Sequence, residues 1–180
     1  MKIAFINGKG GVGKSTCSLL FALALDKAKK NVKVIDSDPQ GTITESLERI
    51  EMNHLLTTQN PHVTIIDTPP RLIDHVEKVI SDADRIVIVS GQGMPNLSTT
   101  VDTINLIDKY GRLNDTIVLF NAVFKNTKGE AITSELNLPV AVVSQRIFQR
   151  QEISRVHEDG FSALTNKTKA ELSNVILEVL

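Results

Sequence analysis

The chain is 180 residues long, which fits one compact domain, and 41% of its residues are hydrophobic, enough to bury a substantial core. Aromatic residues make up only 4%, so this core must be aliphatic, and the single cysteine, Cys17, excludes a disulfide framework and a cysteine-rich metal site. The formal net charge of −1 excludes a global basic field, so any contact with nucleic acid must come from a local patch.

The N-terminal residues do not have the pattern of a secretory signal. The short apolar stretch in "MKIAFINGKGG" runs directly into a glycine-rich loop. No run of the sequence approaches the roughly 18 apolar residues needed to cross a bilayer. We therefore expect a single domain over residues 1–180 that is cytoplasmic, reduced and independent of membranes.

Short β-rich runs alternate with longer helical segments along the chain. The predicted strands are Lys2–Ile6, Val32–Asp36, Val63–Asp67, Arg85–Ser90, Thr116–Asn121 and Val140–Ser144. Several of these runs are almost continuously hydrophobic, as is typical of strands buried on both faces. The alternation predicts an α/β fold of three layers, in which a mostly parallel, twisted sheet carries helices on both faces.

Apolar residues with a spacing near 3.6 predict helices between the strands. The predicted stripes are Leu72, Val76, Val79 and Ile80; Leu97, Val101 and Ile104; and Leu172, Val175, Ile176, Val179 and Leu180. The pattern is weakest between Gly41 and His62, where "TITESLERIEM" predicts a short helix.

The segment "NGKGGVGKST", residues 7–16, follows the first predicted strand and opens the first predicted helix. Gly8, Gly13, Lys14 and Ser15 fit the phosphate-loop pattern G-x-x-x-x-G-K-S/T in the structural context that this pattern needs. Its glycines let successive N–H groups point at phosphate oxygens, and the helix N-terminus adds a positive potential. Lys14 is expected to neutralise the β- and γ-phosphates of a nucleotide, and the Ser15 hydroxyl to complete a Mg²⁺ shell.

The predicted nucleotide-binding residues comprise the loop and one later asparagine. They are Gly8, Lys9, Gly10, Gly11, Val12, Gly13, Lys14, Ser15, Thr16 and Asn121. Asn121, at the end of the fifth predicted strand, is a predicted adenine contact, although an asparagine there could equally bond local backbone groups.

A second lysine in the loop, Lys9, is not required by the general phosphate-loop pattern. "KGGVGKS" resembles the deviant Walker A motif K-G-G-x-G-K-S/T of the P-loop ATPase family that contains ParA, MinD and the nitrogenase iron protein. The resemblance covers essentially the whole chain and implies the P-loop NTPase fold, bound ATP and Mg²⁺, and an ATP-dependent homodimer. In that dimer Lys9 would reach the second copy's phosphates and act in catalysis with Lys14. The alternative is a solvated loop lysine.

Two further segments resemble parts of the same family. "VKVIDSDPQG", residues 32–41, is similar to the ParA switch I sequence D-x-D-P-Q, so Asp38 would position or activate the attacking water and Asp36 would support the magnesium shell. These aspartates could instead cap a turn or helix. "VTIIDTPP", residues 63–70, resembles a Walker B strand, in which Asp67 would hold Mg²⁺ through water. The predicted metal residues are therefore Ser15, Asp36 and Asp67.

The C-terminal third bears on what the dimer binds. Iron-protein relatives need two cysteines per subunit, and the last helix here lacks the basic face of MinD membrane anchors. "SQRIFQRQEISRV", residues 144–156, carries Arg146, Arg150 and Arg155 where small ParF-like ParA proteins contact DNA, and a dimer would duplicate this patch. The alternative is a solvated helix face balanced by neighbouring acidic residues.

The resemblance thus implies a weak ATP hydrolase of the ParA type that binds non-specific DNA and is stimulated by a ParB- or ParG-like adaptor. Such a switch positions plasmid, chromosome or protein cargo on the nucleoid. Two alternatives stay open: a MinD-like regulator acting at a membrane or another protein, and a metabolic ligase of the dethiobiotin-synthetase type. Residues 41–62 form a shorter segment than in most ParA relatives, which leaves open any partner surface that relatives build there.

Overall fold

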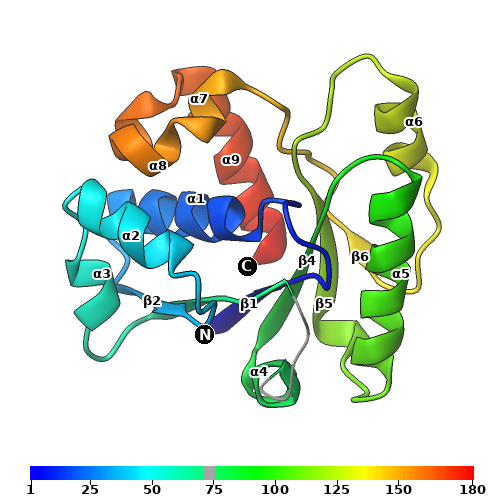
Figure 1. Cartoon of the computed structure of the whole chain (residues 1–180), viewed down its shortest axis with the longest axis horizontal. Coiled ribbons are helices and arrows are strands. Elements are labelled where there is room, and N and C mark those ends of the chain that lie inside the picture. The colour runs from blue at the N-terminus through cyan, green and yellow to red at the C-terminus, as the bar shows by residue number, and fades with distance from the viewer. Residues whose placement is uncertain (71–75) are drawn as a thin grey trace.

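The structure is a computed structural model that describes residues 1–70 and 76–180. Its centre is a six-stranded sheet with the strand order β2-β3-β1-β4-β5-β6 (Figure 1). All the strand pairs are parallel. The strands are β1 (Lys2–Ile6), β2 (Val32–Asp36), β3 (Val63–Asp67), β4 (Arg85–Ser90), β5 (Thr116–Phe120) and β6 (Ala141–Val142). The predicted parallel sheet is confirmed, and β1 to β4 have the predicted bounds.

The last two strands are shorter than predicted. β5 ends at Phe120 rather than Asn121 because Ala122 adopts a positive φ of 53°, which turns the chain out of the sheet. β6 covers Ala141 and Val142 rather than Val140–Ser144. The Val143 N–H still donates to the Val118 carbonyl at 2.9 Å, but the Phe120 carbonyl, two residues on in β5, accepts from the Ile147 N–H at 2.9 Å, so the chain leaves the ladder after Val143.

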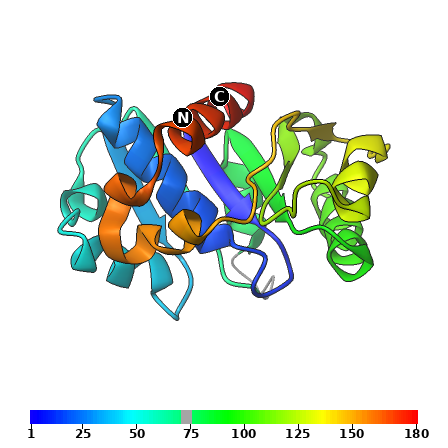
Figure 2. The ribbon, with the colours of Figure 1, turned by 90° about the horizontal axis from the view of Figure 1, so that it is seen from above.

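Helices connect the strands and cover both faces of the sheet. They are α1 (Lys14–Lys27), α2 (Thr42–Arg49), α3 (His54–Thr57), α4 (Val76–Asp82), α5 (Met94–Asp108), α6 (Lys128–Glu135), α7 (Gln151–Ser154), α8 (Val156–Asp159) and α9 (Asn166–Val179), with 3-10 turns η1 (Leu113–Asp115) and η2 (Gly160–Ala163). Helices α1, α2, α8 and α9 gather on one face, and α5 lies on the other (Figures 1 and 2). The short helix predicted within residues 42–52 is confirmed by α2.

Two apolar clusters form the core, one on each face of the sheet. In β1, Ile3 and Phe5 join the cluster that contains α1, whereas Ala4 and Ile6 join the cluster that contains α5. Both faces of the central strands are therefore buried, which explains why their sequences are almost continuously hydrophobic. The three predicted layers are confirmed.

The predicted stripe of α5 needs a correction at Val101, which is 42% exposed. Thr100 and Thr103 face the sheet in its place, beside Leu97 and Ile104. Threonine is tolerated inside because each of these hydroxyls donates to a carbonyl one turn earlier in the helix, at 2.9 and 2.8 Å.

The other two stripes mostly pack as predicted. Val76 and Ile80 of α4 are buried, and Leu72 lies outside the described residues. Helix α9 buries its stripe against the core, except for Leu180, which follows the helix and is 44% exposed. Within the described ranges, no helix has the length and hydrophobicity needed to cross a membrane.

The strand order fixes where a ligand can bind. β1 lies between β3 and β4, and the chain proceeds from β1 to β2 on one side and to β4 and β5 on the other. In an open parallel sheet, ligands bind outside the carboxyl ends of the strands where the order reverses. This point coincides with the glycine loop that follows β1.

Candidate functional site

The loop between β1 and α1 curls tightly, and α1 begins at Lys14. Gly11 and Gly13 have φ values of 76° and 89°, in the left-handed region that favours glycine. At Gly13 the space is also limited, because a Cβ atom would lie 2.1 Å from the Asn121 Nδ2 atom. Both the backbone conformation and the close approach therefore require glycine at position 13.

Asn121 packs against the loop from behind. It is 5% exposed, and its Nδ2 donates to the Val12 carbonyl at 2.9 Å. Its buried Oδ1 has no hydrogen-bond partner within residues 1–70 and 76–180. Asn121 thus makes the local backbone contact that the sequence left as an alternative, and a contact with adenine stays a prediction.

The two lysines occupy different environments within one loop. Lys14 is 6% exposed, and its Nζ donates to the Lys9 carbonyl at 3.2 Å. Burial lowers the pKa of the Lys14 ammonium, and the nearby carboxylates of Asp67 and Asp38 oppose that shift. Lys9 is partly exposed, and among the described residues its Nζ makes no hydrogen bond or ion pair. Lys14 is fixed inside its own loop, whereas no such contact fixes Lys9.

Asp36 lies at the end of β2, opposite Asp67 of β3. Its carboxylate accepts hydrogen bonds from the Asp38 N–H at 3.1 Å and from the Thr44 N–H and hydroxyl at 3.1 and 2.9 Å. Asp36 therefore binds the first turn of α2, as in the capping alternative. Asp38 follows on the turn, where its Oδ1 accepts from the Gln40 N–H at 3.0 Å.

Asp67 is fully buried at the end of β3. Its Oδ1 accepts from the Ser18 hydroxyl at 2.9 Å, whereas its Oδ2 has no hydrogen-bond partner in the described part of the chain. Burial raises the pKa of Asp67 to about 6, while the nearby Ser15 hydroxyl, the hydrogen bond from Ser18 and the Lys14 ammonium oppose this shift. A buried carboxylate oxygen without a partner is costly, so this atom fits a bound cation.

A cavity of about 410 Å³ opens between the glycine loop and α2. Its lining includes Gly10, Gly11, Gly13, Lys14, Ser15, Thr16 and Asp38, all predicted site residues. The loop and Lys14 offer donors for phosphates, and Ser15 in the lining, with the unpartnered Oδ2 of buried Asp67, offers oxygens for Mg²⁺, so these residues fit a nucleotide with that ion. The ion would supply positive charge next to the phosphates, and a role for Asp36 in supporting it stays a prediction.

Four further residues line the cavity: Gln40, Thr42, Pro70 and His157. None of these four is among the site residues predicted from the sequence. The first three belong to or adjoin the motifs that end β2 and β3. That position in the sequence could have marked them as site residues. His157 comes from α8, far along the chain, and no sequence pattern connects it to the loop.

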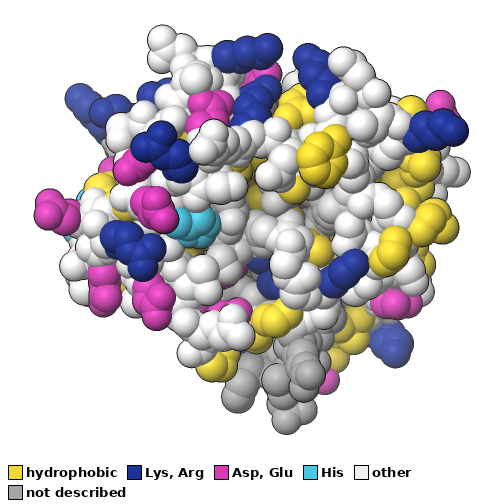
Figure 3. Space-filling view, turned by 45° about the horizontal axis from the view of Figure 1, so that its top comes forward, with side chains coloured by type: hydrophobic (Ala, Val, Ile, Leu, Met, Phe, Trp, Pro, Cys, Tyr) yellow, Lys and Arg dark blue, Asp and Glu magenta, His cyan; other side chains and the backbone are white. Residues whose placement is uncertain are grey.

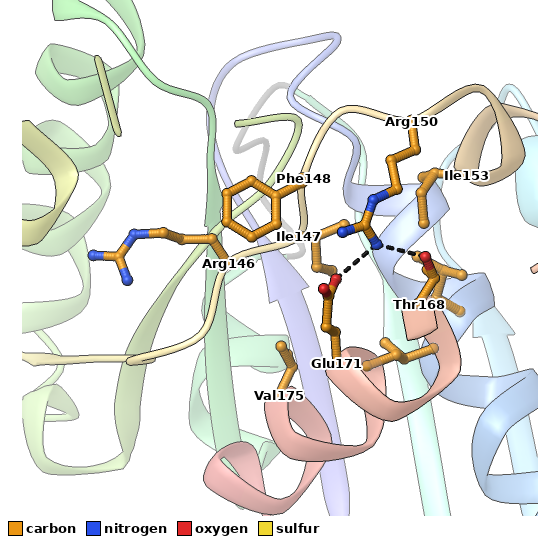
Figure 4. A pocket seen from close by; sticks show the side chains of 10 residues that line it. Arg146, Ile147, Phe148, Arg150, Ile153, Thr168, Glu171 and Val175 are labelled. Atoms are coloured by element: carbon orange, nitrogen blue, oxygen red, sulfur yellow. Dashed lines mark hydrogen bonds and ion pairs between the residues drawn. The ribbon is translucent and has the colours of Figure 1, made fainter. Parts of the chain in front are cut away.

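Of the arginines predicted to contact DNA, Arg150 is 23% exposed, compared with 60% for Arg155. Its guanidinium pairs with the Glu171 carboxylate at 2.6 Å and donates to the Thr168 hydroxyl (Figure 4). Arg146 extends in the opposite direction, on the other side of Phe148 (Figure 4). The two side chains therefore do not present one continuous basic patch.

The remaining contacts of these arginines are also internal. The Arg146 Nε donates to the Thr133 hydroxyl at 3.1 Å. Arg155 forms an ion pair with Asp159, one turn further on, at the surface. Basic and acidic side chains are interspersed on the face seen in Figure 3. The balance by neighbouring acidic residues that the sequence left as an alternative is thus present for Arg155, whereas Arg150 is paired with a residue of α9.

Comparison with known families agrees with this geometry. The model of the CobQ/CobB/MinD/ParA nucleotide binding domain matches residues 3–162. The matched range contains the glycine loop, the aspartates that end β2 and β3, and the arginine-bearing segment after β6.

Individual relatives are more distant. The maintenance of carboxysome distribution protein A of Gloeobacter kilaueensis is 31% identical over 119 residues, which cover 57% of this chain and 55% of that protein. This chain therefore spans about half the length of that curated relative. A putative plasmid partition protein of Borrelia burgdorferi bound to AMPPNP superposes with a TM-score of 0.75 at 18% identity, covering 99% of this chain and 97% of that chain. A chain of the Aquifex aeolicus MinC:MinD cell division complex gives a TM-score of 0.78 at 16% identity, covering 99% and 94%. At these identities the two structures show a shared fold.

Proposed function

This chain belongs to the CobQ/CobB/MinD/ParA family of nucleotide-binding domains, and from that premise we propose that it is an ATP-dependent dimerising switch of the ParA type that positions cargo. The observation that carries the proposal is the contrast between the two loop lysines. Lys14 is buried and bonded within its own loop, whereas Lys9 has no such contact among the described residues. The Lys9 ammonium is therefore available to bind the triphosphate of an ATP molecule held by a second copy of the chain.

The geometry of the pocket supports the following roles, which we propose. Lys14 and the loop N–H groups bind the β- and γ-phosphates of ATP, and Ser15 and Asp67 hold Mg²⁺. Asp38, which lines the cavity, orients the water that attacks the γ-phosphoryl group and yields ADP and phosphate. Lys9 of each copy stabilises the charge that develops on the other copy's transferring group.

We further propose that the dimer binds DNA without sequence specificity. Arg146 has no carboxylate partner in the described part of the chain, and the Arg155 ion pair is exposed, so opening it costs little. Two copies would double these contacts, and the affinity would fall steeply with salt. An adaptor of the ParB or ParG kind would accelerate hydrolysis and return the dimer to monomers on the nucleoid in the cytoplasm. The names of the carboxysome distribution and plasmid partition relatives support a positioning role.

The test is the oligomeric state with a non-hydrolysable nucleotide. Light scattering should show a monomer without nucleotide and a dimer with AMPPNP and Mg²⁺. The Lys9→Ala variant should keep nucleotide binding but stay monomeric, and its ATP hydrolysis should fall by about 10³-fold. Lys30→Ala, an exposed lysine just after α1, is the matched control and should behave as the wild type. A wild-type chain that stays single with AMPPNP, or a Lys9→Ala variant with normal turnover, would contradict the proposal.

The alternatives give different results in two further assays. A metabolic ligase should show ATP turnover that ignores DNA, and ATP should not promote its retention on double-stranded DNA. A MinD-like regulator should co-sediment with liposomes in the presence of ATP and should not be retained on DNA.

A further inference from the structure

His157 connects three elements around the cavity. It lies on α8, which packs against both α1 and α2 (Figures 1 and 2). Its Nε2 lies 2.9 Å from the Thr16 hydroxyl of α1, and its Nδ1 lies 2.7 Å from the Ser46 hydroxyl of α2. One imidazole therefore joins the helix that follows the glycine loop to the helix that follows the Asp38 turn.

The direction of these two hydrogen bonds follows from Ser46. Its hydroxyl donates to the Thr42 carbonyl at 2.7 Å, so its single proton is already used. Its oxygen must then accept from the ring, which places the proton on Nδ1. In a neutral imidazole the other nitrogen is an acceptor, so Nε2 accepts the proton of the Thr16 hydroxyl.

The charged surroundings agree with a neutral ring. Burial lowers the pKa of His157, and the Arg49 guanidinium of α2 adds to this shift, while the Glu158 carboxylate on the same helix opposes it. Lys14 and Asp38 line the same cavity from the loop and the turn.

We propose that His157 is a positioning residue of the nucleotide pocket: as the Nδ1–H tautomer, it holds the Thr16 hydroxyl and ties α2 to α1. The inference rests on the proposed function, since it concerns the same nucleotide site. The inference goes beyond the proposed function because it names His157 as the residue that sets the distance between the phosphate loop and the Asp38 turn. Because the Thr16 hydroxyl donates its proton to His157, it cannot also donate to a phosphate. The backbone N–H of Thr16 is then the group through which this residue binds phosphate.

The first test needs no nucleotide. Long-range ¹H–¹⁵N spectra of the histidine rings in the free protein should show one ring with a protonated Nδ1 and an unprotonated Nε2 near neutral pH, and His157→Gln should remove that signal. A ring at this position with the proton on Nε2 would overturn the inference.

The second test is calorimetric binding of ADP with Mg²⁺. His157→Leu removes both hydrogen bonds and should weaken binding by about tenfold. His157→Gln keeps one donor and one acceptor and should stay within about threefold of the wild type. His54→Leu changes an exposed histidine on α3, so it is the control and should have no effect on ADP binding. Wild-type affinity in His157→Leu, or equal losses in the Leu and Gln variants, would contradict the positioning role.

The two tests separate this inference from the proposed function. If the wild-type protein binds neither ADP nor ATP, the proposed function fails, and the ring spectra still decide the tautomer. If wild-type ADP binding and AMPPNP-dependent dimerisation are normal but His157→Leu binds ADP equally well, only this inference fails. If His157→Leu folds poorly, the Gln variant and the spectra decide the outcome.

Discussion

The nucleotide pocket and the arginine-bearing segment after β6 both contain buried or half-buried charged side chains. The two regions differ in whether those side chains have partners within the chain. Among the described residues, the Asp67 Oδ2 of the pocket has no hydrogen-bond partner, and the one hydrogen bond of the Lys14 ammonium is to a backbone carbonyl. Behind the segment, Arg150 pairs with Glu171, and Thr168 bonds both Arg150 and the Glu152 carboxylate. The charged groups of the pocket therefore lack partners that a ligand could supply, whereas Arg150 already has its partners within the chain.

The difference indicates which charges are there for a ligand. Lys14 and Asp67 influence each other's pKa, but neither forms an ion pair among the described residues, and a buried charge in that position costs free energy unless something outside the chain compensates it. A charge that is already paired has no such requirement, and an added anion must compete with its partner. The pocket therefore has the electrostatics of a binding site, whereas the Arg150 network has those of a structural contact.

The largest expected effect comes from Lys14. Lys14→Met keeps most of the side-chain volume but removes the ammonium, and it should weaken ATP binding by about a hundredfold or more. The free energy of unfolding without nucleotide should not fall, because burial already disfavours this ammonium. Calorimetric titration and urea denaturation measure the two quantities. Lys9→Met is the matched control and should still bind ATP; a large loss of stability in Lys14→Met would show that Lys14 is a structural residue.

Asp67 should make the stability of the nucleotide-free protein depend on pH. Its pKa is about 6 in the folded chain, compared with an ordinary value of 3.8, so the folded state binds the proton more tightly. The contribution is present in full below pH 4 and is lost as the pH rises through 6, by about 3 kcal/mol in all. Asp67→Asn should lack this loss.

Urea denaturation of the wild type and of Asp67→Asn between pH 4.5 and 7.5, without Mg²⁺ or nucleotide, measures the difference between the two profiles. Parallel profiles would show that Asp67 is compensated within the chain. Addition of Mg²⁺ and ATP should restore stability to the wild type at pH 7.5, since a bound cation satisfies the free carboxylate oxygen.

The sequence predicted the fold and the loop well because both depend on local patterns. Buried strands are hydrophobic runs, and the phosphate loop needs glycines at fixed positions, such as Gly13 beside Asn121. The errors arose where hydrogen bonds that the hydrophobic pattern does not encode decide the outcome. β6 is short because the Ile147 N–H takes the Phe120 carbonyl, and the inner face of α5 includes threonines whose hydroxyls are satisfied within the helix.

The same limit applies to the candidate site. His157 and Glu171 lie far from their partners in the chain, so neither the link between Thr16 and Ser46 nor the pairing of Arg150 has a sequence pattern. The sequence identifies the charged residues, but which residues they contact depends on how α8 and α9 pack on α1.

The smallest expected effects separate the arginines from one another. Arg150→Ala should lower the free energy of unfolding by about 1–2 kcal/mol, because it removes a half-buried ion pair and a hydrogen bond to Thr168. Arg155→Ala removes only an exposed pair and should cost about 0.5 kcal/mol or less. For DNA retention of the ATP-bound dimer at low salt the order should reverse, with Arg146→Ala and Arg155→Ala each weakening binding more than Arg150→Ala does. If all three variants lose DNA retention equally, the Arg150–Glu171 pair must open to contact phosphate. If none of them loses DNA retention, this segment does not bind DNA.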